Sequence, residues 1–245
     1  MKKALFGYLL LLGMGSYAQQ IQVTYERRAN IENQLKNIKN EEQKKQVSNI
    51  LAKPVSYSLI YNDGSSLYIS SPETKKTSDS NQTLKIGEKQ IKTIQIGKKD
   101  GGIYKNHQTR EYLQEANLFG KKFLIKDTLK AIEWIFTEET KKIGEYKVKK
   151  ATAYLNGETV TAWYSEEIPV SEGPHYYYGL PGLIIEAETD KLSFHAISIV
   201  FNKKPIPIEK PSKGKEVSLK AFIKLRNEKI EELKSGNGNM LRFGG

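Results

Sequence analysis

The sequence predicts a mainly β (α+β) fold, an antiparallel curved sheet or half-barrel meander with an N-terminal and a C-terminal helix. Runs of alternating apolar and polar residues occur through much of the chain between Ile21 and Phe201, and this is the period of a half-buried strand. Turn sequences of the Asn-Gly and Asn-Asp-Gly type separate some of these runs. Two segments with apolar residues near helical spacing lie towards the two ends.

The first residues have the pattern of a secretory signal peptide. Lys2 and Lys3 precede an apolar run over 4–14, and Ser16-Tyr17-Ala18 is a small-x-small cleavage site. The run is shorter than the roughly 20 apolar residues that span a bilayer. We therefore expect export, with the periplasm as the location and the cell surface or the medium as alternatives, and no transmembrane segment in the mature chain.

The expected organisation is a signal peptide over 1–18, one β-rich domain over 19–234 and a flexible tail over 235–245. Such a length is sufficient for a substantial core. The sequence has no cysteine, which excludes disulfides and thiolate metal sites. The net charge of +11 falls to +11 − 2 = +9 without Lys2 and Lys3. Because the basic residues are scattered, with no arginine-rich arm, we expect no nucleic-acid partner.

The N-terminal third predicts a strand, a helix and a hairpin. The strand covers 21–25, and the helix covers 30–52 and ends before Pro54. The hairpin joins 55–61 to 67–69 through Asn-Asp-Gly at 62–64. A polar stretch over 71–83 predicts a mobile loop.

A second hairpin is predicted over residues 146–165. Its Asn-Gly turn at 156–157 tolerates positive φ at both positions. The turn sets a register of four pairs: Tyr154 with Thr159, Ala153 with Val160, Ala151 with Ala162, and Lys150 with Trp163. One face then carries only small residues, namely Ala151, Ala153, Val160 and Ala162.

Two structures could cover this small-residue face. The first is the amphipathic helix expected over 219–233, packed close against the sheet. The second is a cavity for a lipid or small apolar ligand. The sequence favours the helix, because tertiary packing stabilises most amphipathic helices.

The stretch over 173–188, GPHYYYGLPGLIIEAE, predicts a corner followed by a strand. Pro181 at the second and Gly182 at the third position of a turn are typical of type II, which has positive φ at the glycine. Gly179 would let a neighbouring backbone approach closely. With a two-residue turn at 189–190, Ile185 would face Phe194, and Ile184 would face His195.

These residues resemble the GLPGLI family of exported envelope proteins. The resemblance rests on Gly173-Pro174 and on Gly-Leu-Pro-Gly-Leu-Ile at 179–184, preceded by Ala-Trp-Tyr at 162–164 and Glu-Ile-Pro at 167–169. It covers about residues 144–201. It implies location and fold, and no catalytic activity, cofactor or binding residue. His175 and Glu158 depart from the family pattern, in which an aromatic and a basic residue are expected.

No residue pattern indicates catalysis. The three histidines, His107, His175 and His195, show no metal-ligand spacing, so we expect no metal or cofactor. His195 is expected in the core and His107 in solvent. Glu166 and Glu167 are adjacent on a strand and should point to opposite faces, which argues against a glycosidase pair.

The leading hypothesis is therefore a non-catalytic binding or assembly module for another envelope protein. Its expected binding residues are His175, Tyr176, Tyr177, Tyr178, Gly179, Leu180, Pro181 and Gly182 at the corner, together with Trp163. A periplasmic carrier of a lipid or small apolar ligand in a half-barrel cavity is the alternative. A hydrolase with an unrecognised site is the third hypothesis.

Overall fold

A computed structural model describes residues 20–36, 38–71, 84–86, 89–91, 102–118, 120–204 and 206–235. Twelve strands in these residues form one sheet: β1 (Gln20–Ala29), β2 (Val55–Asn62), β3 (Ser65–Ser70), β6 (Ile103–Asn106), β7 (Glu111–Leu118), β8 (Lys121–Thr128), β9 (Ile135–Ile143), β10 (Tyr146–Leu155), β11 (Glu158–Ser165), β12 (Leu183–Glu188), β13 (Leu192–Asn202) and β14 (Lys215–Val217). Strands β4 (Leu84–Ile86) and β5 (Lys89–Ile91) pair separately. The helices are α1 (Ile31–Leu35), α2 (Glu41–Leu51) and α4 (Leu219–Ser235). The mainly β prediction is confirmed.

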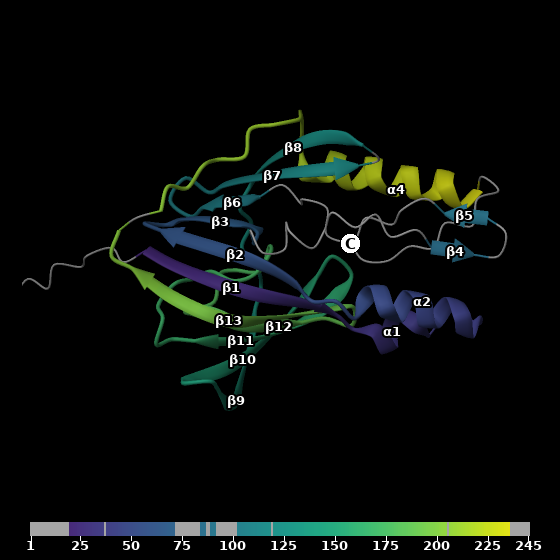
Figure 1. The fold of residues 1–245 in the computed structure, drawn as a ribbon. Helices are drawn as coiled ribbons and strands as arrows, with labels where there is room; N and C mark the ends of the chain where they lie inside the picture. The colour runs from purple at the N-terminus through teal and green to yellow at the C-terminus, as the bar shows by residue number, and fades with distance from the viewer. Residues whose placement is uncertain are drawn as a thin grey trace, which may run out of the picture.

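The sheet consists of two meanders that meet at its centre. Its strand order is β14-β8-β7-β6-β3-β2-β1-β13-β12-β11-β10-β9. One meander runs outward from β1 to β8, and the other runs inward from β9 to β13, where β13 pairs with β1. The ladders between these strands are antiparallel, and the short β14 adds to β8 in parallel. Figure 1 shows β8 and β9 on opposite sides of the molecule.

The sheet must bend strongly, because a short segment joins its two sides. Only residues 129–134 connect β8 to β9, and such a link reaches at most about 25 Å when extended. Ten strand spacings separate β8 from β9 in the strand order, which would amount to about 48 Å in a flat sheet. The two meanders therefore curve towards each other, and residues 129–134 cross the open side. We call these residues the crossover.

The N-terminal helix prediction is only partly correct. The expected helix over 30–52 is divided into α1 and α2, and each begins with its own asparagine cap. The Asn40 side chain accepts a hydrogen bond of 2.9 Å from the backbone N–H of Gln43, which starts a second helix where a single one was expected. Ile38, Val47 and Leu51 are buried together in this region.

Two of the predicted hairpins form as expected, and a third differs. The β2–β3 turn and the β10–β11 turn have positive φ at Asp63-Gly64 and at Asn156-Gly157, and the four predicted pairs of β10 and β11 are present. In β12 and β13, Glu186 pairs with His195 and Ala187 with Phe194. The predicted register was wrong by two residues. The Thr189 hydroxyl binds the N–H of Leu192 at 3.2 Å, which stabilises a longer loop.

The C-terminal helix packs on a different part of the sheet from the one expected. In α4, Phe222 contacts Phe123 of β8, with ring centroids 5.6 Å apart. The N–H of Leu219 donates to Asp127 of β8 at 3.1 Å. The small-residue face of β10 and β11 packs with other residues. The prediction that this helix covers the alanines is therefore wrong.

Several predictions fall on residues outside those described. They are the signal peptide over 1–18, almost all of the loop over 71–83, and the tail beyond Ser235. Within the described ranges, no helix combines the length and apolar character that crossing a bilayer requires.

Candidate functional site

The segment between β11 and β12 lies inside the bent sheet. We call residues 166–182 the plug segment. Its Ile168 and Val170 are buried in a cluster with residues of β1, β2 and β3. It is also bonded to the start of β12: the N–H of Leu183 donates to Ile168 O at 2.9 Å, and the N–H of Ile184 to Glu172 O at 2.9 Å. The plug segment therefore connects the two meanders from within.

The plug segment also covers the small-residue face. Tyr177 and Leu180 are buried in one cluster with Ala151, Ala153 and Ala162. Alanines leave space above a sheet, and here the chain's own tyrosine and leucine occupy it. The face on which the carrier hypothesis depended is thus part of the core.

The two glycines of the signature have roles opposite to those predicted. Gly179 has φ +90°, whereas φ at Gly182 is outside the positive region, so the predicted type II turn with positive φ at Gly182 was wrong. A Cβ at Gly182 would lie 2.1 Å from the carbonyl oxygen of Ser165. Gly182 is therefore required for close approach of two backbones, and Gly179 for its conformation.

A buried ion pair anchors the plug segment to the first meander. The side chains of Glu172 and of Lys105 in β6 are 0% exposed, and Glu172 Oε2 lies 2.5 Å from Lys105 Nζ. The other oxygen, Oε1, lies 2.5 Å from His107 Nε2 and accepts a hydrogen bond of 2.8 Å from the Ser66 hydroxyl. We call Glu172, Lys105, His107 and Ser66 the Glu172 cluster.

The charge state of Glu172 follows from these contacts. Burial alone would raise the pKa of its carboxyl group. The charge of Lys105 and the hydrogen bond with His107 outweigh burial, so the pKa of Glu172 lies below its ordinary value. Glu172 is therefore an anion with both oxygens in contact with partners.

Tyr178 covers the Glu172 cluster and ties it to the crossover. Its ring centroid lies 5.2 Å from Lys105 Nζ and 5.6 Å from the ring of His107. Its hydroxyl donates to Lys130 O at 2.5 Å, and its carbonyl accepts from Trp134 Nε1 at 2.9 Å. The crossover and the plug segment are thus joined above the buried charges.

His175 is held in an aromatic environment by a strained backbone. Its φ is +56°, and its ring lies 4.3 Å from that of Tyr176 and 6.2 Å from those of Tyr68 and Phe194. Burial, followed by the positive charges of Arg27 and Lys105, lowers the pKa of His175 to about 3. The imidazole is therefore neutral near pH 7.

The Glu172 cluster lacks the arrangement of a hydrolase. Ser66 donates to Glu172 rather than to His107, so His107 is not placed to activate this serine. Glu166 binds Lys149 at 2.7 Å, and Glu167 accepts from the N–H of Lys147 at 2.9 Å, so the adjacent acids have separate partners. Across the residues described, no group of three or more His, Asp or Glu side chains is suited to a metal ion.

Two histidines lie in environments different from those expected. His195 was expected in the core, yet its side chain is 40% exposed and contacts Glu186 Oε1 at 3.1 Å. His107 was expected in solvent, and it instead contacts the buried Glu172.

The structure separates the predicted binding residues into two places. Tyr177, Leu180 and Gly182 are buried; His175, Tyr176 and Tyr178 are half-buried; only Gly179 and Pro181 are exposed. Trp163 lies apart from them, with Lys141 Nζ 4.3 Å and Lys150 Nζ 6.0 Å from its ring centroid. Tyr177 and Leu180 of the corner thus belong to the core, whereas Tyr176 and Tyr178 stay partly exposed, and the use of the corner as a binding surface remains a prediction.

Sequence reasoning did not identify the Glu172 cluster. Two signals were available. Glu172 immediately precedes Gly173-Pro174, and Lys105 and His107 are two residues apart, as neighbours on one side of a strand are. Nothing in the sequence pairs these two segments.

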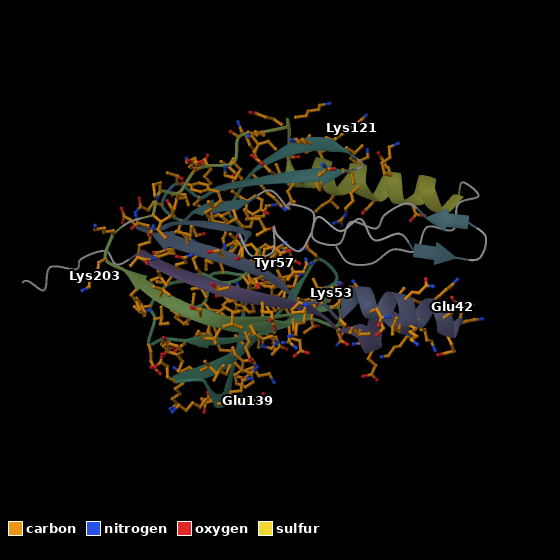
Figure 2. All side chains as sticks on the ribbon, in the orientation of Figure 1. Glu42, Lys53, Tyr57, Lys121, Glu139 and Lys203 are labelled. Atoms are coloured by element: carbon orange, nitrogen blue, oxygen red, sulfur yellow. The ribbon has the colours of Figure 1, made fainter. Side chains whose placement is uncertain are left out.

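Some large apolar side chains lie at the surface of the described residues. Six large apolar side chains are exposed among the described residues: Ile135, Phe136, Tyr154, Ile197, Val200 and Phe201. Three of them lie on β13: Ile197 and Val200, which we call the β13 patch, and Phe201, which as the neighbour of Val200 points to the opposite face and pairs with the buried Ile21. The exposed Lys203 and Lys204 follow directly. Figure 2 shows Lys203 beyond the end of β13.

These features define a class of protein: a bent, open β-sheet with an internal plug segment pinned by a buried ion pair. A family model described as a protein of unknown function (Porph_ging) matches residues 154–186, which include the GLPGLI signature. No curated protein sequence matches the chain.

Two solved structures resemble the fold. Both are of PNGF-II, one in space group C2 and one in P21, with TM-scores of 0.54 and 0.55 and sequence identities of 18% and 19%. The likeness covers 86% of this chain in each case, and 33% and 34% of the PNGF-II chain. The chain thus spans about a third of the length of PNGF-II. At this identity the likeness shows the fold alone.

Proposed function

We propose that the chain is an exported member of the GLPGLI family and a non-catalytic binding module for another protein of the cell envelope. The observation that carries the proposal is the β13 patch. Its residues Ile197 and Val200 are 57% and 47% exposed, on a strand near the middle of the strand order. The match over residues 154–186 supports the family, and the signal-peptide pattern supports export.

The patch has the composition of a protein interface. Grouped, exposed apolar side chains on a soluble surface commonly mark sites where another protein binds. Lys203 and Lys204 border the patch, and the whole chain is basic. The partner should therefore carry an apolar patch bordered by acidic side chains, because complementary charge accelerates association and excludes other partners.

The interior of the fold supports binding rather than catalysis. The Glu172 cluster is enclosed and its charges are paired, and the plug segment is bonded to both meanders. Such an interior gives a stable frame for a surface site. A fold of this kind also makes up about a third of the PNGF-II chain, which is consistent with a module that works beside other protein parts.

Copurification with two double variants tests the proposal. The chain is isolated after gentle crosslinking in its host, as wild type, as I197T/V200T and as K203E/K204E. Threonine keeps the preference for a strand while removing apolar surface. The control is Tyr154→Thr, which removes a side chain that is 73% exposed on β10, away from the patch.

The expected result is one partner that wild type and Y154T retain and that both patch variants lose, with unchanged thermal unfolding. The purified partner should bind wild type more weakly at high salt, because salt screens the lysine contribution. Retention of the partner by both patch variants would contradict the proposal. So would a native mass spectrum in which the protein carries a stoichiometric lipid and no second polypeptide.

A further inference from the structure

The segment that follows β13 crosses the outer face of the sheet, the face opposite the plug segment. We call residues 206–213 the strap, and Figure 1 shows this part of the chain running from the end of β13 to the side of the molecule that holds β8. The side chain of Gln20 in β1 donates to Ile206 O at 2.6 Å and accepts from the Ile206 N–H at 2.5 Å. Lys210 binds Glu111 of β7 at 2.6 Å. The strap is therefore fixed to β1 and to β7.

A cavity of about 390 Å³ lies between the strap and the turn that joins β2 to β3. Residues 206–208 line one side of it, and Asn62, Asp63, Ser65 and Tyr104 line the other. Lys105 contacts Glu172 of the plug segment, so Tyr104, its neighbour on β6, points to the outer face. The volume is within the range of about 300–1,000 Å³ that holds small molecules in proteins.

Two hydroxyl groups that line the cavity leave a donor free. The side-chain amide of Asn106 donates to Ser65 Oγ at 2.9 Å and to the Tyr104 hydroxyl at 3.4 Å, so both oxygens already accept. The two hydroxyls lie 3.4 Å apart, and at most one of them can donate to the other. Among the described residues neither has another acceptor. At least one O–H group, on Ser65 or on Tyr104, is therefore available to donate to a ligand.

The β2–β3 turn adds acceptors to this donor. Asp63 is exposed, and its backbone carbonyl accepts from the Gln108 side chain at 3.4 Å. Its carboxylate, which can only accept, has no hydrogen-bond partner in the part of the chain that the structure describes. The same is true of the side-chain amide of Asn62, which can donate and accept. The cavity thus carries unused donors and unused acceptors together.

Residues 206–208 give the cavity an apolar wall opposite these groups. Ile208 packs against the cluster that contains the buried Tyr104, which holds this part of the strap on the sheet. Lys210 Nζ lies 5.0 Å from the centroid of the Tyr104 ring, and its charge is paired with Glu111. The ring is therefore covered by the strap, whereas its hydroxyl lies beside Ser65.

We propose that this cavity binds a single neutral sugar ring. Each sugar hydroxyl both donates and accepts, so neighbouring hydroxyls can donate to Asp63 and accept from the free O–H group of Ser65 or Tyr104. The C–H face of the ring can pack on residues 206–208. A phosphate group only accepts, and it would meet the Asp63 carboxylate. An ammonium group only donates, and it would leave the free O–H group without an acceptor.

Titration followed by NMR tests the proposal. Full-length protein is expressed with isotopic labelling and purified in the form that the cell accumulates. Glucose, mannose, galactose and N-acetylglucosamine are the probes, and inorganic phosphate and ethylammonium chloride are the comparison ligands. At least one sugar should shift the backbone amide signals of Asp63, Ser65 and Ile208. The shifts should saturate with a Kd on the order of 1 mM, because few groups contact so small a ligand.

Two variants each remove one of the proposed contacts. Asp63→Asn loses the charged acceptor and keeps a residue type that tolerates positive φ. Tyr104→Phe loses the hydroxyl and keeps the ring beneath Ile208. Each should weaken sugar binding by roughly three- to tenfold. The matched controls are Asp190→Asn, in the exposed β12–β13 loop, and Tyr154→Phe, at a side chain that is 73% exposed on β10. Both controls should bind as wild type does.

Three results would each overturn the proposal. The first is that no sugar shifts these signals, and the second is that phosphate or ethylammonium binds more tightly than every sugar. The third is that D63N and Y104F bind sugar as tightly as their controls do. The site is separate from the β13 patch, so I197T/V200T should bind sugar normally and D63N should retain the protein partner. This test and that of the proposed function can therefore fail independently.

Discussion

The carboxylate of Glu172 lies 2.5 Å from the ammonium group of Lys105, and neither side chain is exposed to solvent. Glu172 belongs to the plug segment, and Lys105 belongs to the first meander. A charge in this position is stable only while its partner is present. The contact therefore ties the plug segment to the first meander, in addition to the backbone hydrogen bonds that join it to β12.

Glu172→Gln should lower the free energy of unfolding by about 3–5 kcal/mol, because it leaves Lys105 buried without its anion. The double variant E172Q/K105M should lose less than the sum of the two single variants. Chemical denaturation of all four proteins gives the coupling energy. If E172Q lowered the free energy of unfolding by no more than the loss of an exposed ion pair does, this result would contradict the buried contact.

His175→Asn should reduce the acid sensitivity of the fold. Asparagine tolerates the positive φ at this position and does not titrate. In wild type the pKa of His175 falls from 6.5 to about 3 on folding, so below pH 6.5 the unfolded chain binds the proton that the folded chain excludes. Stability therefore falls as pH decreases from 6.5 to about 3, by up to roughly 1.4 kcal/mol per pH unit.

Denaturation at a series of pH values measures this slope in wild type and in H175N. Glu172 contributes in the same direction but at lower pH, because its pKa is lowered and its stabilisation is lost below its ordinary value of 4.5. The difference in slope between the two proteins should extend from about pH 6.5 to about pH 3. Between pH 6.5 and 4.5 Glu172 contributes little, so this window is the clearest for His175. Equal slopes there would show that folding does not lower the pKa of His175.

Gly182→Ala should be more destabilising than Gly179→Ala. The new Cβ at residue 182 would lie 2.1 Å from the backbone oxygen of Ser165, so backbone must move, at a cost of about 3 kcal/mol or more. At residue 179 the nearest atom is 3.9 Å away, and only the strain of positive φ remains, about 1–2 kcal/mol. Thermal unfolding compares the two variants. If Gly179→Ala were the more destabilising variant, the result would favour the type II turn with positive φ at Gly182 that the sequence predicted.

Ala162→Leu should destabilise the fold by about 1–3 kcal/mol, because Tyr177 and Leu180 already occupy the space above it. Thr159→Leu, on the opposite face of β11, is the matched control and should have little effect. Denaturation measures both. A tolerated A162L variant would indicate free space at this face, as a carrier of apolar ligands requires.

The sequence predicted the parts of this fold that depend on local chemistry. The Asn156-Gly157 turn determines the register of β10 and β11 without help from the rest of the chain. The β12–β13 register could not be found in this way, because the Thr189 hydroxyl lengthens the loop. The helix over 30–52 was predicted without the cap that Asn40 provides in its middle.

The site was less predictable than the strands. The GLPGLI signature was recognised as a special segment, but its burial depends on Lys105 and Ser66, which lie 67 and 106 residues before Glu172. Turn chemistry identified Pro181 and Gly182 as a corner, and only the position of Ser165 shows why glycine is required there. Contacts over such separations leave no periodic signal in one sequence.

The position of β1 at the centre of the sheet sets the order in which the molecule can assemble. Ile21 pairs with Tyr61 on one side, 40 residues away, and with Phe201 on the other, 180 residues away. The first meander can therefore form as the chain is made, whereas β1 gains its second neighbour only after the chain extends through β13. Until then β1 is an open edge, and the slow, long-range closure of this central ladder is the step at which the folding protein is most exposed to aggregation.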